Sequence, residues 1–272
     1  MEIGRGRFLD KLDNEIWMIS SNGTNTQQVK PMSSDQQPWL VSIGRGNYRK
    51  SSAAIDQLLL QLEAKGVNVV SFESTRARTS RNLDAWWSAW CGGRVALWCE
   101  HHARAGALVR KVFKGMRVLA GGDLKTWALA IKYTPNEQAV AELRALLLQW
   151  HRSGPHRRVY VLGHSAGALV ASMVHDAPNV VGLVGFGYPF KHPDHEEEPT
   201  RTRHLGQVSK PFLIVQGELD SYGSPAQAVA YGLSATTRVA PIECTHDYNL
   251  TAEQQTLCMQ WLNDFLFVGH SG

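Results

Sequence analysis

The chain has 272 residues, and 43% of them are hydrophobic, which is enough to bury one large core or one core with an inserted subdomain. The net charge is only +4 and the basic residues are scattered, which argues against a nucleic acid as the main partner. The four cysteines match neither a CxxC redox site nor a zinc pattern, so we expect reduced, buried thiols.

The first thirty or so residues do not show the alternation of apolar runs and helical patterns that the rest of the chain shows. We expect a hairpin at a sheet edge, formed by Glu15–Ser20 and Thr26–Val29. The first residues carry charges where a signal peptide has an apolar core, and no uncharged run approaches the roughly 18 apolar residues of a membrane span. We therefore expect a cytoplasmic protein without a transmembrane segment.

Six short apolar runs alternate with helical patterns through the rest of the chain. Continuous apolar runs are typical of strands buried on both faces, and their alternation with helices predicts an α/β fold with a mostly parallel central sheet. The expected strands are Trp39–Ile43, Val67–Phe72, Val159–Leu162, Val180–Gly185, Phe212–Gln216 and Thr237–Ile242, and the expected helices are Ser51–Lys65, Asn136–Trp150, Ala166–Asp176, Pro225–Leu233 and Thr251–Phe267. One interval, Glu73–Thr134, lacks a core strand and carries the run AWWSAW, so we predict a helical insertion there.

The run Gly163-His164-Ser165-Ala166-Gly167 has the form GxSxG. It follows a predicted buried strand and opens a predicted helix, which is the strand–turn–helix setting of a nucleophile elbow. Glycines on both sides of the serine remove side chains that would clash across so tight a turn. Ser165 is therefore a candidate nucleophile; the alternative is a turn whose serine only caps the helix.

A serine nucleophile needs a base and a carboxylate that orients the base. His246 lies between the last predicted strand and the last helix, and Asp220 follows the strand FLIVQ, with Glu218 as the rival acid. The order Ser, Asp, His is that of α/β-hydrolases. We expect Asp247 to be a solvent or capping residue.

The remaining polar groups have more ordinary interpretations. His164 is expected to pack against the sheet, and the acidic, proline-containing run His192–Glu198 is expected to be a solvated loop rather than a metal site. The oxyanion donors are expected to be the N–H of Ala166 and an N–H of the loop Gly44–Asn47, with Arg45 as the best choice. We expect no metal and no organic cofactor.

Several motifs together resemble the KANL3/Tex30-like α/β-hydrolases, of which dienelactone hydrolases are more distant relatives. They are the elbow GHSAG, then Gly182–Phe190, Arg201–Leu205 and Pro211–Asp220 with Gly223, in that order. The resemblance covers the C-terminal half and implies an α/β-hydrolase fold, with Asp220 as the triad acid and His246 as the base. The N-terminal half departs from the family, because Ile43 stands where the family has a His before the oxyanion loop.

The sequence thus predicts a serine esterase that works through an acyl-enzyme. Thioesters or small amides are alternative substrates, and a non-catalytic interaction module is a third reading. The insertion is the core of a small subdomain, or a lid whose Trp86 and Trp90 bind the acyl chain, or a surface whose basic residues meet a membrane or an acidic substrate. The substrate is expected to be a small ester, and the oligomeric state stays open.

Overall fold

The computed structural model describes residues 37–45, 52–120, 132–154, 157–195 and 198–268. All of them belong to the compact unit Asp35–Gly272. The expected N-terminal hairpin, and residues 46 and 47 of the expected oxyanion loop, lie outside the described residues.

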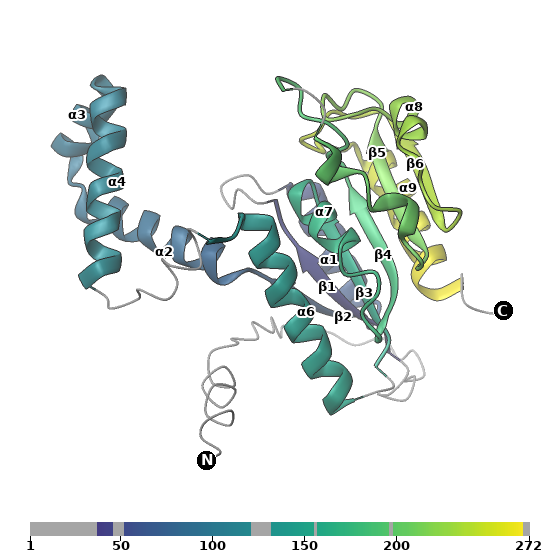
Figure 1. The fold of residues 1–272 in the computed structure, drawn as a ribbon. Helices are drawn as coiled ribbons and strands as arrows, with labels where there is room; N and C mark the ends of the chain where they lie inside the picture. Colours follow the sequence, from purple (N-terminus) through teal and green to yellow (C-terminus); the bar gives the residue numbers. More distant parts are fainter. Residues whose placement is uncertain (1–36, 46–51, 121–131, 155–156, 196–197, 269–272) are drawn as a thin grey trace, which may run out of the picture. The chain divides into compact units, whose positions relative to one another are not determined.

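Six parallel strands form one sheet in the order β2-β1-β3-β4-β5-β6 (Figure 1), which confirms the predicted α/β fold with a parallel sheet. The strand order reverses at β1: β2 lies on one side of it, and β3, which follows β2 in the chain, pairs with its other side. The strands are β1 (Trp39–Ile43), β2 (Asn68–Phe72), β3 (Val159–His164), β4 (Val180–Phe186), β5 (Phe212–Gly217) and β6 (Thr237–Ile242).

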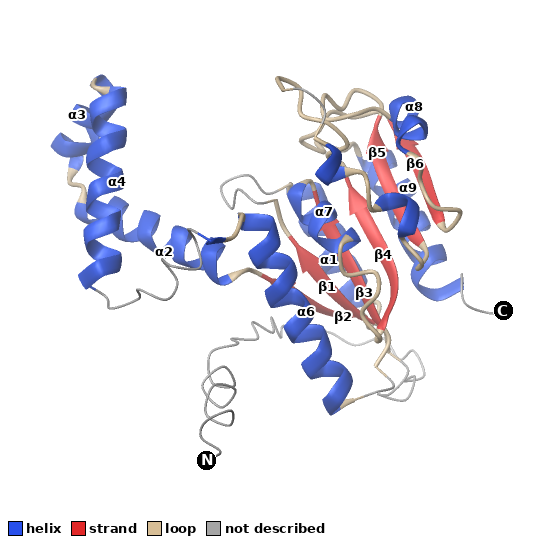
Figure 2. Cartoon of the chain, in the orientation of Figure 1, coloured by secondary structure: helices blue, strands red, loops and turns tan. Residues whose placement is uncertain are grey.

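Helices cover both faces of the sheet (Figure 2). On one face Val161 of β3 packs with Leu143 and Leu147 of α6, and on the other Tyr160 and Leu162 pack in the cluster that contains α1 and α9. Burial on both faces explains why the inner strands β1, β3, β4 and β5 are nearly continuous apolar runs, whereas the edge strands β2 and β6 are only partly buried. The helices of the two layers are α1 (Ala53–Ala64), α6 (Pro135–Ser153), α7 (Ala166–Ser172), α8 (Pro225–Ala228) and α9 (Ala252–Asn263).

Two helices end earlier than the sequence predicts. The helix after the elbow ends at Ser172, whose hydroxyl donates to the Leu169 carbonyl at 2.7 Å, and turns follow it. The helix from Pro225 becomes a 3₁₀ turn at Val229–Tyr231 and stops at Gly232, which has φ +59°. Glycine adopts this left-handed conformation without strain, and so it terminates helices.

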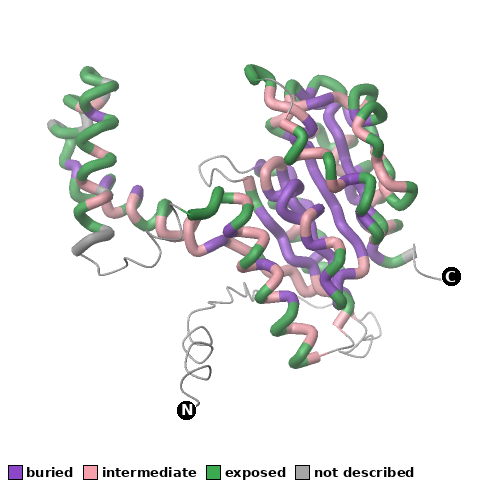
Figure 3. Tube along the Cα trace, viewed as in Figure 1, coloured by how far each residue is buried: buried purple, intermediate pink, exposed green. Residues whose placement is uncertain are grey.

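The predicted insertion is helical where it is described. It comprises α2 (Thr75–Trp90), α3 (Gly93–His101) and α4 (Ala103–Ala120), which we call the helical arm. α2 and α4 share an aromatic cluster in which Phe113 lies 4.0 Å from the Trp90 ring and 5.1 Å from the Trp86 ring, between centroids. Arg110 of α4 also pairs with Asp84 of α2. In Figure 3 most of α3 and α4 is exposed or half-buried, in contrast to the buried strands.

Candidate active site

Ser165 lies at the sharp turn between β3 and α7. Its φ of 56° and ψ of −119° are an uncommon conformation for a residue with a side chain, so the backbone there is strained. Its N–H donates to the Phe186 carbonyl at 2.9 Å, which ties the turn to β4. A strained residue persists only where its surroundings fix it, and such residues concentrate at functional sites.

The two glycines of the motif are required by close backbone packing. A Cβ on Gly163 would overlap the backbone of Gly167, and a Cβ on Gly167 would lie 2.6 Å from the carbonyl oxygen of Gly44 and even nearer to that of Ile43. The start of α7 therefore touches both the end of β3 and the end of β1. This contact places the loop after β1 beside Ser165.

Three side chains from separate loops form one hydrogen-bonded chain. The Ser165 Oγ lies 2.8 Å from His246 Nε2, and His246 Nδ1 lies 3.0 and 2.9 Å from the two carboxylate oxygens of Asp220. An ionised carboxylate only accepts hydrogen bonds, so Nδ1 carries the proton and Nε2 is free to accept the serine proton. The arrangement can therefore draw a proton from Ser165 while Asp220 stabilises the resulting imidazolium.

Asp220 is held in place by groups other than the histidine. Its Oδ2 accepts from Gln216 Nε2 at 3.1 Å, and its Oδ1 accepts from the Tyr222 N–H at 2.8 Å. Gln216 is itself buried and donates to the Gly223 carbonyl at 2.6 Å. The carboxylate is thus oriented by β5 and by the turn after it, and its side chain is fully shielded from solvent.

The imidazole of His246 also has a partner on its flat face. The Tyr222 ring stacks on it with a centroid separation of 4.2 Å and an interplanar angle of 29°. The His192 ring packs edge-on against the Tyr222 ring, with 5.7 Å between the ring centroids. The stacking fixes the plane of the His246 ring.

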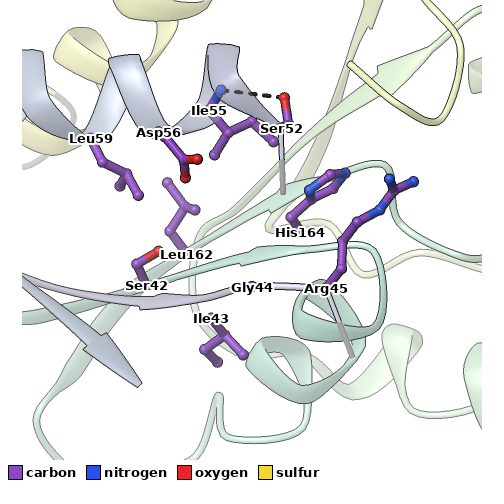
Figure 4. A pocket seen from close by; sticks show the side chains of 10 residues that line it. All are labelled: Ser42, Ile43, Gly44, Arg45, Ser52, Ile55, Asp56, Leu59, Leu162 and His164. Carbon is purple, nitrogen blue, oxygen red and sulfur yellow. Dashed lines mark hydrogen bonds between the residues drawn. The ribbon is translucent and has the colours of Figure 1, made fainter. Parts of the chain in front are cut away.

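The backbone of His246 is fixed by the end of β1. The Arg45 guanidinium donates to the His246 carbonyl at 2.9 Å and to the Asp247 carboxylate at 2.8 Å. His164 Nε2 lies 3.4 Å from the same carbonyl. Figure 4 shows the side chains of Arg45 and His164 next to each other. Burial, followed by the nearby Arg45 charge, lowers the pKa of His164 to about 3, so this histidine is neutral and serves as a hydrogen-bond donor.

A small cavity lies between α1 and the ends of β1 and β3 (Figure 4). Its volume is about 50 Å³, and its lining mixes apolar groups such as Leu59 and Leu162 with the polar Ser42 and Asp56. Ligand pockets usually measure about 300–1,000 Å³. The cavity is therefore too small for a substrate. Burial raises the pKa of Asp56, which lines it.

The structure brings some predicted residues to the site and leaves others elsewhere. α7 begins at Ala166, whose N–H lacks an acceptor within the helix. The Glu218 side chain is exposed, whereas Asp247, expected to be a solvent or capping residue, pairs with Arg45 although its side chain is 61% exposed. Trp86 and Trp90 contact each other and Phe113 in the helical arm.

Neither a metal-binding cluster nor a membrane-spanning helix is found in the described part of the chain. There, no group of three or more His, Cys, Asp or Glu residues has the arrangement of a metal site. His192 and His195 stack on each other at 4.2 Å, and Glu198 pairs with Arg201 at 2.7 Å. No described helix is both long and apolar enough to span a bilayer.

Sequence reasoning missed three supporting residues. Tyr222 carried no signal, because a tyrosine in a turn is ordinary. Gln216 did carry one, since it is the polar member of the otherwise apolar strand FLIVQ, and buried polar groups need partners. Arg45 was selected for its backbone N–H, whereas the structure gives its side chain a separate role at His246.

Comparison with known proteins agrees with this geometry. Residues 132–265 match a family model described as an alpha/beta hydrolase domain, and no curated protein sequence matches significantly. An alpha-beta serine hydrolase homologue from Coxiella burnetii superimposes with a TM-score of 0.51 at 16% identity, over 87% of this chain and 88% of that one. A serine hydrolase from Xanthomonas campestris, described as having no lid, gives 0.50 at 14% over 84% and 80%, and an esterase domain from a Rhodothermus marinus protein gives 0.51 at 10% over 86% and 88%. The chain therefore has an α/β-hydrolase fold.

Proposed function

We propose that this chain is a serine hydrolase that cleaves carboxylic esters through an acyl-enzyme. The observation that carries the proposal is the hydrogen-bonded chain from Ser165 through His246 to Asp220, built on a strained strand–turn–helix. Fold alone would not support it, because one fold hosts many functions.

In the proposed reaction Ser165 Oγ attacks the ester carbonyl while His246 Nε2 takes its proton. The tetrahedral intermediate collapses, and His246 gives the proton to the departing alcohol. Water then attacks the acyl-enzyme with His246 again as the base, which releases the acid and restores Ser165. Asp220 keeps the imidazole in the required tautomer, and the stacked Tyr222 holds the plane of the ring.

The oxyanion of this reaction needs two donors near Ser165. We assign one to the N–H of Ala166, because it opens α7 and has no acceptor within that helix. The second remains assigned to the loop after β1, with the Arg45 N–H as the choice. The close approach of Gly167 to the carbonyls of Ile43 and Gly44 supports this assignment.

A fluorophosphonate probe tests the proposal without any guess about the substrate. We expect the wild-type chain to be labelled on Ser165, Ser165→Ala to lose the label, and His246→Ala to react far more slowly. Peptide mapping by mass spectrometry identifies the labelled residue. A folded wild-type protein that takes up no label would instead favour an interaction module.

The finer specificity is part of the same proposal. Thioesters and small amides pass through similar tetrahedral intermediates, so a panel of p-nitrophenyl esters, acyl thioesters and anilides has to separate them. Membership of the KANL3/Tex30-like group is likewise a proposal, carried by the motifs of the C-terminal half. We expect esters to be hydrolysed at the highest kcat/KM; a higher value for thioesters would change the assigned class.

Substrate binding by Trp86 and Trp90 also stays a prediction. Their stacking with Phe113 fits the core of a small subdomain as well as it fits an acyl site. If these rings bind acyl chains, kcat/KM should rise from acetyl to octanoyl esters, since each buried CH₂ contributes up to about 0.8 kcal/mol. Trp86→Ala or Trp90→Ala should then flatten this dependence more than it lowers acetyl-ester turnover.

A further inference from the structure

The helical arm carries a charge opposite to that of the rest of the chain. Between residues 75 and 120 there are nine Lys and Arg against two Asp and Glu, a net charge of +7. The whole chain carries only +4, so the other residues together carry −3. The modest overall charge therefore combines a strongly basic segment with a remainder of the chain that is slightly acidic.

The same segment exposes large apolar side chains. Of the 15 large hydrophobic residues exposed in the described part of the chain, eight lie in α2, α3 and α4, which are only a small fraction of it. Single exposed apolar residues are normal, but a concentration of them marks an interaction surface. The eight residues are Trp90, Val95, Leu97, Trp98, Leu108, Val109, Val112 and Met116.

On α4 these residues are arranged as a stripe. Leu108, Val112 and Met116 follow one another at intervals of four residues, so they share one side of the helix, and they are 63%, 53% and 52% exposed. Gly106 and Phe113 face the other helices of the arm: a Cβ on Gly106 would lie 2.6 Å from the Cys99 carbonyl of α3, and Phe113 stacks on α2. The stripe is thus the side of α4 that the arm does not cover.

Basic residues flank the stripe. Arg104 lies one turn before Leu108, Lys111 lies one turn after it, and both are exposed. Helices with an apolar face, flanking Lys and Arg, and nearby tryptophans bind in the interface of anionic bilayers. Basic residues near such a surface add electrostatic attraction to anionic lipids.

We propose that the α3–α4 part of the helical arm is a binding surface for anionic membranes, with the stripe Leu108, Val112 and Met116 inserted among the lipids. Charge selects this occupant: a second copy of the chain would bring another basic arm, with a net charge of +7 between residues 75 and 120, against the first, and a nucleic acid would leave the apolar stripe in water. Membrane binding of this kind is peripheral and does not depend on the chemistry at Ser165.

Sedimentation of the full chain with vesicles tests the proposal. We expect binding to vesicles of equal parts phosphatidylglycerol and phosphatidylcholine, much weaker binding to pure phosphatidylcholine, and loss of binding as salt is raised. Val112→Asp should weaken binding by about tenfold or more, because it puts a charge in the apolar face. Val229→Asp is the matched control, since Val229 is 80% exposed but lies outside the arm.

Three further measurements decide between outcomes. Ser165→Ala should bind vesicles like the wild type, which separates this proposal from the proposed hydrolase function. Circular dichroism should show that Val112→Asp remains folded, as expected for an exposed position. Equal weakening by Val112→Asp and Val229→Asp, binding of DNA without binding of vesicles, or a dimer abolished by Val112→Asp without vesicle binding would each overturn the proposal.

Discussion

The contact between Gly167 and the end of β1 can be tested by adding a single methyl group. In Gly167→Ala the new Cβ would lie 2.6 Å from the Gly44 carbonyl oxygen and nearer still to that of Ile43, whereas real Cβ contacts do not fall below 3.0 Å. Both neighbours are backbone atoms, so α7 and the loop after β1 must move apart by about half an ångström. A displacement of about 1 Å at a reacting group can cost about 100-fold in rate, so we expect kcat/KM for a p-nitrophenyl ester to fall about 10- to 100-fold.

The free energy of unfolding of this variant should fall by about 1–3 kcal/mol, which is typical of an overpacked core position. Urea denaturation followed by circular dichroism measures that loss. Gly115→Ala in α4 is the matched control, because a Cβ there meets nothing within 4 Å, and it should keep full activity. A folded Gly167→Ala with wild-type kcat/KM would refute the idea that this contact sets the geometry around Ser165.

Three other predictions concern the residues that surround His246. Asp220→Asn should lower kcat by orders of magnitude while Glu218→Gln changes it little, because only Asp220 reaches the imidazole; the reverse result would exchange their roles. Tyr222→Leu should lower kcat/KM about 2- to 30-fold, whereas Tyr222→Phe keeps the stacked ring and should keep kcat/KM near that of the wild type. The pKa of His164 is about 3 in the folded chain, below its ordinary 6.5, so the unfolded chain binds the extra proton and stability falls as pH drops below 6.5. At pH 5 this loss is about 2 kcal/mol, and urea denaturation at pH 7 and pH 5 should show it clearly reduced in His164→Gln.

The sheet could be predicted from sequence because its inner strands are buried on both faces. A run such as Val159–Leu162 must be apolar throughout, which distinguishes it from an amphipathic helix, and four such runs form the centre of the parallel sheet. Helix ends were less predictable, because they depend on local hydrogen bonds. The early end of α7 at Ser172, for example, accompanies a hydroxyl bond to Leu169 that no periodicity reveals.

Some residues of the candidate site could likewise be predicted from sequence, and others could not. Ser165 could be, because close backbone packing in the turn requires the two glycines beside it, and these form a recognisable motif. Tyr222 contacts His246, which lies 24 residues later in the chain, and the Arg45 side chain contacts the same residue 201 positions later. No pattern in the sequence near Tyr222 or Arg45 indicates these contacts. Residues that shape their own backbone are readable from sequence, whereas residues that support a distant partner are not.

The surface of the helical arm could be predicted only in part from the sequence, which shows its charge but not which of its apolar residues are exposed. The excess of Lys and Arg between residues 75 and 120 can be counted in the sequence, but the average over the whole chain conceals it. The sequence does not show which apolar residues are exposed, because Phe113 and Val112 are adjacent and both hydrophobic. Phe113 packs on α2 while Val112 is 53% exposed, and this difference arises only when α2 and α4 fold against each other. A surface that combines charge with an apolar stripe therefore becomes visible only when the local charge count is placed on the folded helix.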